Sequence, residues 1–354
     1  MEKIKSLQKI LKNSDEAILI SSPENRRYFT GFPSSDGFLI VTCDDAVLFT
    51  DSRYIEAAQK TALCRASLVT KASKEIEFYF ENKGITKILA ERERLTVETA
   101  DFLKKAFHPR RVVPSKSLER KINELRAVKS ADETDCIKKA QSIAEEAFSH
   151  ILGFIKPGVT EKSIALELDF YMLSHGAEAL SFETIAVTGK KTSMPHGVPD
   201  NTVVADGDFV TMDFGAVYKG YHSDMTRTVA VGNISAEQKK VYEIVLSAQK
   251  SALQTLKKGV SCKTADAAAR DIIKENGYGE YFGHGTGHGV GIEIHELPNV
   301  SPASNTVLTR GNIVTVEPGI YIPGKFGVRI EDMALITEEG FENLTRAPKE
   351  LIIL

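Results

Sequence analysis

The sequence contains no run of 18 or more apolar residues, so no segment is long enough to cross a bilayer as a helix. The N-terminal stretch MEKIKSLQKILKNSDE is charged throughout and lacks the apolar core of a signal peptide. Its pattern predicts an amphipathic helix with Ile4, Leu7, Ile10 and Leu11 inward. The four cysteines are scattered and form no CxxC pair, so we expect reduced thiols and no disulfide framework. These absences predict a cytoplasmic protein with no membrane partner.

An excess of charge of one sign is also lacking, since 45 Lys and Arg stand against 48 Asp and Glu, for a formal net charge of −3. A near-neutral balance gives no reason to expect nucleic acid as a partner. The chain has 354 residues, of which 42% are hydrophobic and 26% charged. That length and composition indicate a globular protein with room for two domains.

Short apolar runs alternate with helical patterns in the N-terminal third of the chain, which is typical of an α/β domain. Strands are expected at 17–21, 38–42, 46–50, 66–70 and 87–90, and helices at 53–60, 75–82 and 95–107. The segment VVPSKSLERKINELRAVKS is polar and basic, and we place the domain boundary inside it. We therefore expect a smaller domain over residues 1–125 and a larger one over residues 126–354.

The larger part contains an internal repeat. A capping box at Ser130 predicts a helix over 131–155, and a second one at Ser235 predicts a helix over 236–256. These helices are followed by KPGVTEKS and KKGVSCKT, which are 101 residues apart and each open a further helix. Each copy then continues into a pair of strands. This order predicts a pseudo-symmetric α+β domain whose strands meet at its centre.

Each copy of the repeat has a hairpin with two acidic residues in otherwise apolar strands. In DFVTMDFGAVYKGYHSDMTRTVAV, a turn centred on Tyr-Lys would bring Asp213 opposite Asp224. In NIVTVEPGIYIPGKFGVRIEDMALIT, a turn centred on Gly324 would bring Glu317 opposite Glu331. A slip of one residue in either register would break these pairings.

Carboxylates that face each other in buried strands are destabilising unless something neutralises them. Four carboxylates carry −4, and two divalent cations carry +4. A set of oxygen ligands with one imidazole favours Mn²⁺, Co²⁺ or Fe²⁺ over a zinc centre of the thiolate type. Two such ions can activate a water molecule and polarise a carbonyl group. The four acidic residues are therefore candidate metal ligands.

The stretch GHGTGHGVGIEIHE, residues 283–296, supplies the imidazole. Every second residue from 283 to 291 is glycine, which disfavours a helix and indicates extended chain that something approaches closely. We expect His288 to complete the metal site. We also expect the glycines to let the strand come close to the metal ions and to the backbone of a substrate.

The order Asp213, Asp224, His288, Glu317, Glu331 resembles the ligand set of the pita-bread metallopeptidases. The most similar branch is proline-directed, and comprises aminopeptidase P and Xaa-Pro dipeptidase (prolidase). SFETIAVTG, MPHGVPDN, MDFGAVYKGYHSDMTRT, HGTGHGVGIEIHE and EPGIYIPGKFGVRIED carry the resemblance, and NRRYFTGF and FTDSRYIEAA resemble the creatinase-like N-terminal domain of the family. The resemblance implies an α+β protein with a pseudo-two-fold pita-bread (creatinase/aminopeptidase) domain after a smaller α/β creatinase-like domain.

The resemblance also assigns the metal ligands, for two divalent ions with Mn²⁺ favoured, Co²⁺ as the alternative, and Zn²⁺ or Fe²⁺ less favoured. It implies that Asp224 and Glu331 bridge both ions. It implies that Asp213 binds one ion, and that His288 and Glu317 bind the other. Glu317 would also carry a proton between the nucleophilic water and the leaving amine.

Further residues match the family outside the ligand set. His196 in PHG resembles a histidine that contacts the scissile peptide, and His295 in IHE resembles one that stabilises the tetrahedral intermediate. His284 resembles a substrate-binding histidine of the proline-directed branch. Arg329 resembles an arginine that orients ligands and substrate, and Thr226 is expected to hold a ligand carboxylate.

The implied substrates are short peptides with proline at the second position, and the family is commonly a homodimer. Methionine aminopeptidase shares the ligands but is a single domain, and creatinase shares both domains but does not use the metal pair. A non-catalytic binding protein of this fold, or a metal-storage protein, would not need both the full ligand set and the substrate-side histidines. Dipeptidase and aminopeptidase P remain equally compatible with the motifs.

Overall fold

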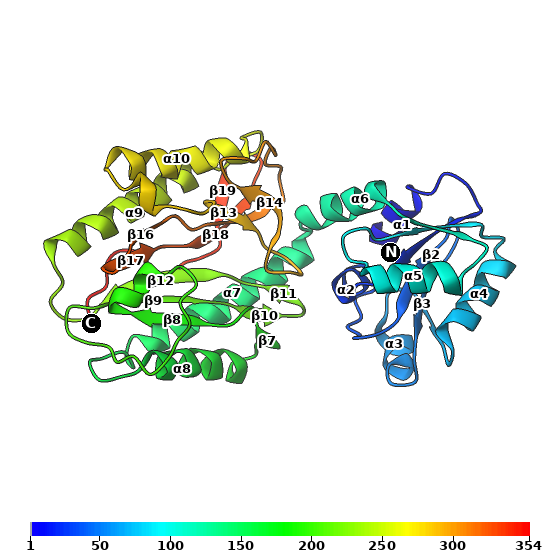
Figure 1. Cartoon of the computed structure of the whole chain (residues 1–354), viewed down its shortest axis with the longest axis horizontal. Coiled ribbons are helices and arrows are strands. Elements are labelled where there is room, and N and C mark those ends of the chain that lie inside the picture. Colours follow the sequence, from blue (N-terminus) through cyan, green and yellow to red (C-terminus); the bar gives the residue numbers. More distant parts are fainter. Residues whose placement is uncertain (1) are drawn as a thin grey trace. The chain divides into compact units, whose positions relative to one another are not determined.

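The computed structural model describes residues 2–354, which divide into two compact units between Leu125 and Arg126 (Figure 1). None of the described helices is long and apolar enough to cross a membrane.

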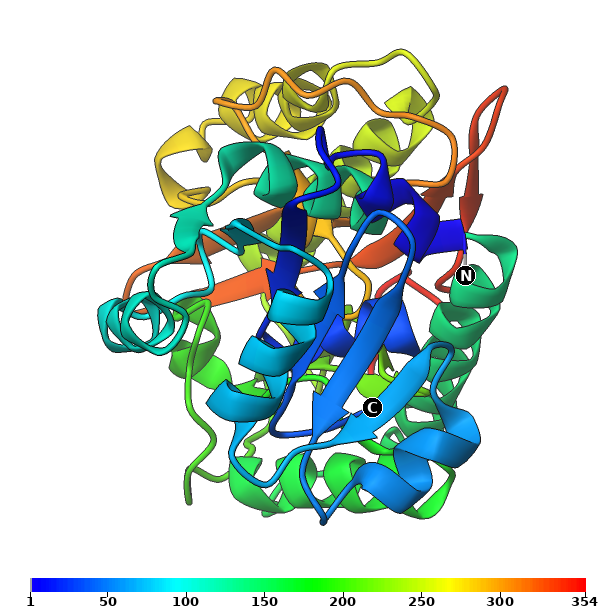
Figure 2. The same ribbon diagram turned by 90° about the vertical axis from the view of Figure 1, so that its right-hand side faces the viewer.

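The first unit is built around a mixed six-stranded sheet in the order β4-β3-β2-β1-β5-β6 (Figure 2). Side chains alternate between the faces of a strand, and β3 uses both faces. Val47 and Phe49 pack in a core cluster with helices α4 and α5, whereas Leu48 packs with Ala58 of α3. The elements of this unit are α1 (Glu2–Gln8), β1 (Glu16–Ile20), α2 (Pro23–Thr30), β2 (Phe38–Val41), β3 (Ala46–Thr50), α3 (Ile55–Thr61), β4 (Arg65–Leu68), α4 (Ala72–Asn82), β5 (Lys87–Ala90), α5 (Val97–Ala106), β6 (Arg111–Pro114) and α6 (Lys116–Ala127).

The five predicted strands of this unit are present, but two helices and one strand were missed. Helix α2 buries Asn25 and Arg26 beside Tyr28 and Phe29, so polar residues interrupt the apolar period of its buried face. The polar segment read as a boundary forms β6 and α6, in which buried Leu118 and Ile122 lie one turn apart among charged residues. Sequence periodicity failed in both helices because polar side chains mask the apolar stripe.

The second unit places helix pairs on the two outer sides of its strands, with α7 and α8 on one side and α9 and α10 on the other (Figure 1). Its main sheets have the orders β12-β9-β8 and β14-β13-β15-β18-β19, and β16 pairs with β17. The elements are α7 (Ala131–Ile151), α8 (Glu161–Ser174), β7 (Ala179–Leu180), β8 (Ile185–Thr188), η1 (Gly189–Ser193), β9 (Phe209–Phe214), β10 (Ala216–Tyr218), β11 (Tyr221–His222), β12 (Met225–Ala230), α9 (Ala236–Thr255), α10 (Cys262–Glu275), η2 (Gly279–Tyr281), β13 (Gly287–Gly289), β14 (Glu296–Val300), β15 (Ile313–Val316), β16 (Gly319–Ile322), β17 (Phe326–Arg329), β18 (Asp332–Ile336) and β19 (Phe341–Asn343).

The predicted repeat is confirmed in this unit. Both capping boxes form, at Ser130 and at Ser235, although the helices they begin end at Ile151 and Thr255, earlier than predicted. The two eight-residue repeats cap the next helices in the same way, through Thr160 for α8 and Ser261 for α10. The side-chain oxygen of each cap accepts the N–H of the third residue on, which satisfies a donor at the helix end.

The two hairpins differ in how well their registers were predicted. The second is centred on Gly324 as expected, and Val316 pairs with Asp332 in the same register. The predicted register of the first hairpin is wrong by two residues, since Asp213 pairs with Thr226 and not with Asp224.

The cause of the error lies in the turn of the first hairpin. Tyr218 pairs with Tyr221, so the loop is Lys219-Gly220, and both residues have positive φ, 49° and 80°. Two-residue hairpin loops with positive φ at both positions match the twist of the strands. Because side chains alternate with period two, a displacement of two residues leaves Asp213 and Asp224 on one face.

Candidate metal centre

The four carboxylates predicted as ligands lie around one cavity. Asp213 is near the end of β9, Asp224 lies just before β12, Glu317 lies between β15 and β16, and Glu331 lies between β17 and β18. The two halves of the repeat are joined here, since the N–H of Glu331 donates to the carbonyl of Thr226 at 3.1 Å. The cavity has a volume of about 320 Å³ and is lined by Phe182, Glu183, Thr184, Ile185, His196, Gly197, Val198, Pro199, Asp213, Asp224, His288, Ile294, His295, Glu317 and Glu331.

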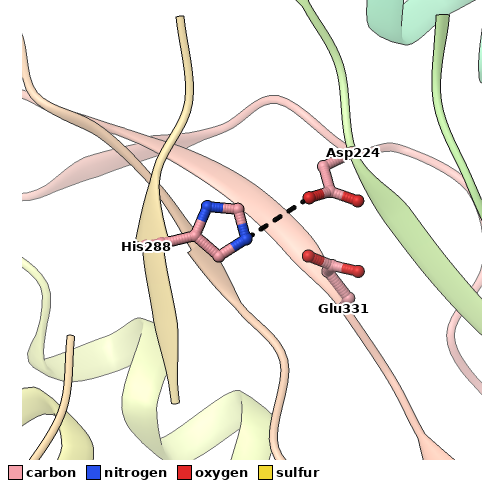
Figure 3. A group of neighbouring side chains, drawn as sticks. All are labelled: Asp224, His288 and Glu331. Atoms are coloured by element: carbon pink, nitrogen blue, oxygen red, sulfur yellow. Dashed lines mark ion pairs between the residues drawn. The ribbon is translucent and has the colours of Figure 1, made fainter. Parts of the chain in front are cut away.

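His288 projects from β13 toward this cluster (Figure 3). Its Nε2 atom is 3.5 Å from Asp224 Oδ2 and 3.4 Å from Glu317 Oε1. One ligand atom each from Asp224, His288 and Glu331 lie within 4.8 Å of one another. The Nδ1 atom of His288 lies 3.1 Å from the carbonyl oxygen of Gly289, which leaves Nε2 directed at the carboxylates.

The glycines around His288 have a different role from the one predicted. A Cβ atom on Gly287 would lie 2.0 Å from the carbonyl oxygen of Thr315, and one on Gly289 would lie 2.4 Å from that of Leu297. A Cβ atom on Gly291 would lie 2.4 Å from the carboxylate of Glu296. The groups that approach these glycines are thus neighbouring parts of the chain itself. Close packing of β13 against β14 and β15 holds His288 in place.

Gly287→Ala should therefore lower stability by about 3 kcal/mol, the upper end of the usual cost of overpacking, because the Thr315 carbonyl belongs to a paired strand and cannot move aside. Gly283→Ala is the matched control in the same stretch, since its Cβ would meet nothing within 4 Å, and it should change stability by less than about 0.5 kcal/mol. Urea denaturation of both variants measures the difference. Equal stability of the two would contradict the close-packing explanation.

Like charges are crowded in the cluster, and the pKa values reflect this. Burial, followed by the charges of Asp213 and Glu317, raises the pKa of Asp224 well above its usual range. Burial and the charge of Asp224 do the same to the pKa of Glu331. Burial raises the pKa of Glu317 to about 7, although the charge of Arg329 opposes the shift. Burial lowers the pKa of His288, which favours the neutral imidazole that a metal ion requires.

The buried guanidinium of Arg329 compensates part of this charge. Its Nη2 donates to Asp213 Oδ2 at 2.6 Å, and its Nε donates to Thr226 Oγ1 at 3.0 Å. Thr226 in turn donates to Glu331 Oε2 at 2.7 Å, so it holds a carboxylate of the other half of the repeat. One cation serves four carboxyl groups, and the raised pKa values of Asp224, Glu317 and Glu331 show that burying all four as anions is unfavourable.

The residues present fit divalent metal ions. Among the residues that the structure describes, Asp213 Oδ1 and Glu331 Oε1 are buried without a hydrogen-bond donor. Buried carboxylate oxygens without donors are rare and need a positive partner. Because Glu331 lies with Asp224 and His288 in a group whose ligand atoms are within 4.8 Å of one another, a cation is the fitting partner. The oxygen-rich set with one imidazole suits the harder divalent metals.

The predicted substrate-side histidines do not all lie in the cavity. His196 and His295 line it, and the ring of His295 is 4.3 Å from that of His288. His284 is absent from the lining and is instead hydrogen-bonded to Tyr321, at 2.9 Å from Nε2 to the hydroxyl. Arg329 is likewise absent from the lining.

Sequence reasoning missed Tyr321 and Thr315. Tyr321 accepts from Arg329 Nη1 at 3.0 Å, and Thr315 donates to Glu317 Oε1 at 3.1 Å. Thr315 could have been found, because it stands two residues before Glu317 and therefore on the same strand face. Tyr321 gave no such signal, since its contact with Arg329 depends on how the hairpin twists.

Known proteins share these features over the whole chain. A model of metallopeptidase family M24 matches residues 135–338, and a model of the Creatinase/Prolidase N-terminal domain matches residues 3–128. The Xaa-Pro dipeptidase of Pyrococcus horikoshii is 40% identical over 353 residues, 99% of each chain.

Solved structures agree with the family models. The Xaa-Pro dipeptidase from Bacillus anthracis matches with a TM-score of 0.95 and 44% identity, over 100% of this chain and 99% of that one. The X-Pro aminopeptidase from Thermotoga maritima matches with a TM-score of 0.92 and 35% identity, over 98% of this chain and 99% of that one.

The chain belongs to metallopeptidase family M24. The predicted fold class, a pita-bread domain preceded by a creatinase-like domain, is confirmed. Membership of this family implies divalent metal ions, and the carboxylate cluster around His288 is the part of the described chain that fits them.

Proposed function

We propose that this protein hydrolyses the peptide bond preceding proline and releases the N-terminal residue of Xaa-Pro peptides. The observation that carries the proposal is the gathering of four carboxylates and one imidazole around a single cavity, with two buried carboxylate oxygens that have no donor. The likeness to an Xaa-Pro dipeptidase over nearly the whole chain supports the proline-directed specificity.

The proposed metal ligands are Asp213, Asp224, His288, Glu317 and Glu331. We propose two divalent ions, with Mn²⁺ as the favoured metal, because four of the five side chains offer oxygen. When bound, such ions would supply an activated water and a polarised scissile carbonyl. Asp224 and Glu331, one from each half of the repeat and both buried, would be among the residues that hold the ions.

The chain itself contributes binding and proton transfer. His196 and His295 line the cavity beside His288 and would bind the scissile peptide and the oxyanion that develops on it. Glu317 would take a proton from the attacking water and deliver it to the proline nitrogen, which is a tertiary amide without an N–H. Apolar side chains in the cavity wall, Phe182, Ile185 and Val198, would exclude water and contact the proline ring.

Arg329 and His284 would act indirectly. Arg329 orients Asp213 through its 2.6 Å hydrogen bond, and Thr226 orients Glu331. His284 would influence substrate binding only through Tyr321, with which it shares a hydrogen bond.

The organisation proposed for the whole protein follows the same family. Residues 1–125 would form the creatinase-like domain, and residues 126–354 would form the catalytic domain. We propose a cytoplasmic homodimer that acts on short peptides with proline at the second position.

The experiment compares three substrates with the purified protein in Mn²⁺: an Xaa-Pro dipeptide, an Xaa-Pro-Xaa tripeptide, and an Xaa-Ala dipeptide as control. We expect release of the first residue from at least one proline substrate, and little release from Xaa-Ala. Preference for the dipeptide indicates a prolidase, and preference for the tripeptide indicates an aminopeptidase P. Equal cleavage of Xaa-Ala, or no cleavage with metal bound, would refute the proposal.

A further inference from the structure

The segment Phe282–Thr286 connects η2 to β13 and has no regular secondary structure. Two of its five residues are glycine, and a Cβ atom on Gly283 would meet nothing within 4 Å. Glycine-rich chain of this kind has large conformational freedom, so its own sequence does not determine its position. The segment nevertheless leads directly into His288. Contacts from other parts of the chain must therefore fix the position of the segment.

An ion pair on helix α10, between the buried Asp266 and the half-buried Arg270, contacts this segment at several points. Asp266 and Arg270 are four residues apart and form two parallel hydrogen bonds, both 2.8 Å long. The remaining donors of the guanidinium reach two carbonyl oxygens of the segment, that of Phe282 at 3.0 Å and that of His284 at 2.7 Å. The guanidinium also lies over the Phe282 ring, 4.2 Å from its centroid. A planar fork of five donors suits this arrangement, and a lysine could not reproduce it.

Asp266 holds the other end of the segment. Its Oδ1 accepts from the backbone N–H of Thr286 at 3.1 Å and from the hydroxyl of Thr286 at 2.8 Å. The carbonyl of Thr286 accepts the N–H of Glu317 at 2.8 Å. One buried carboxylate on α10 is thereby linked through Thr286 to the backbone of a proposed metal ligand.

A second route leads from the segment to Asp213. The guanidinium of Arg329 can only donate, so the Tyr321 hydroxyl accepts from it and must give its own proton to Nε2 of His284. The Nδ1 atom of His284 then carries the ring proton and donates to the carbonyl of Gly285 at 2.8 Å. Both nitrogens of His284 are thus used within the protein, and the ring supports Arg329, which holds Asp213.

We propose that Asp266 and Arg270 are positioning residues for the metal centre. They fix Phe282–Thr286 so that Thr286 places Glu317, and so that His284 supports the Tyr321–Arg329–Asp213 chain. Neither residue lines the cavity or contacts a proposed ligand side chain. The inference rests on the proposed metal site and extends it to a helix outside the ligand set.

The test is the affinity of the metal-free protein for Mn²⁺, measured by titration calorimetry, in wild type, Arg270→Met, Arg270→Lys and Asp266→Asn. We expect Arg270→Met to bind Mn²⁺ about 10–100-fold more weakly, the range found when residues that orient metal ligands are removed. Arg270→Lys and Asp266→Asn should lie between wild type and Arg270→Met, because each keeps part of the hydrogen bonding. The milder variants also keep the test valid if Arg270→Met folds poorly.

A matched control separates positioning from loss of stability. Leu168→Ala removes a buried core side chain on α8, in the core cluster of the other helix pair. It should lower the melting temperature and leave Mn²⁺ affinity unchanged. The proposal is overturned if Arg270→Met binds Mn²⁺ as tightly as wild type, or if Leu168→Ala weakens binding to the same extent.

The same titration separates the two proposals. If wild type itself fails to bind Mn²⁺ or any other divalent metal, the proposed function fails. If wild type binds metal and cleaves Xaa-Pro peptides while Arg270→Met shows unchanged affinity, only the positioning role of α10 is wrong.

Discussion

Replacing Glu331 with glutamine should raise the melting temperature of the metal-free protein and remove its stabilisation by Mn²⁺. In the metal-free state, Glu331 is buried next to Asp224, and burial together with that charge raises its pKa. Glutamine has nearly the same shape, can still accept from Thr226, and presents an amide donor to the carboxylates. We expect a gain of about 1–3 kcal/mol, the usual cost of an unsatisfied buried polar group.

When metal is added, wild type should become more stable than Glu331→Gln. A ligand at 100 times its dissociation constant stabilises the folded state by about 2.7 kcal/mol, and wild type should gain this whereas Glu331→Gln should not. Differential scanning fluorimetry with EDTA and with Mn²⁺ measures both states. Glu342→Gln replaces an exposed charge paired with Lys138 and is the control. It should change neither the melting temperature in EDTA nor the stabilisation by Mn²⁺. A metal-free Glu331→Gln that melts below wild type would show that the cluster is not electrostatically strained.

Replacing Arg329 with methionine should lower the melting temperature of the metal-free protein, whereas Glu331→Gln should raise it. Arg329 is fully buried and donates to Asp213, Thr226, Tyr321 and the carbonyl of Pro195. Methionine fills a similar volume but leaves the carboxylate of Asp213 without a cation. Breaking a buried ion pair from one side costs about 3–5 kcal/mol, which for a unit of this size is a fall of about 6–20 °C.

The double variant Arg329→Met with Asp213→Asn is the check on this reasoning. If the loss arises from the unpaired carboxylate, neutralising it should restore a large part of the stability of the metal-free protein, as a double-mutant cycle would measure. Additive losses in the double variant would indicate that packing, and not charge, accounts for the effect of Arg329→Met.

Local sequence rules predicted much of this site because four of its five candidate ligands belong to two hairpins. Glu317 and Glu331 were placed correctly, since the turn at Gly324 determines the register of the whole hairpin. Asp213 and Asp224 were placed on the correct face although the turn at Lys219-Gly220 was misread, because an even displacement preserves the face of a strand.

The glycines near His288 show where local rules stop. Alternating glycine indicated close approach, but the pattern cannot say what approaches. The structure has carbonyl oxygens of Thr315 and Leu297 there, from strands on either side of β13. His284 shows the same limit, since its motif indicated a substrate contact and the fold directs its ring to Tyr321.

By itself, the sequence determined the repeat, the helix caps and the four carboxylates on two hairpins, because caps, turns and strand alternation depend on residues close together along the chain. Only the tertiary structure decided how charge is compensated. Arg329 reaches Asp213 across 116 residues, and Thr226 reaches Glu331 across 105. Such pairings depend on how the two halves pack together, and packing is a property of the folded chain that no local pattern records.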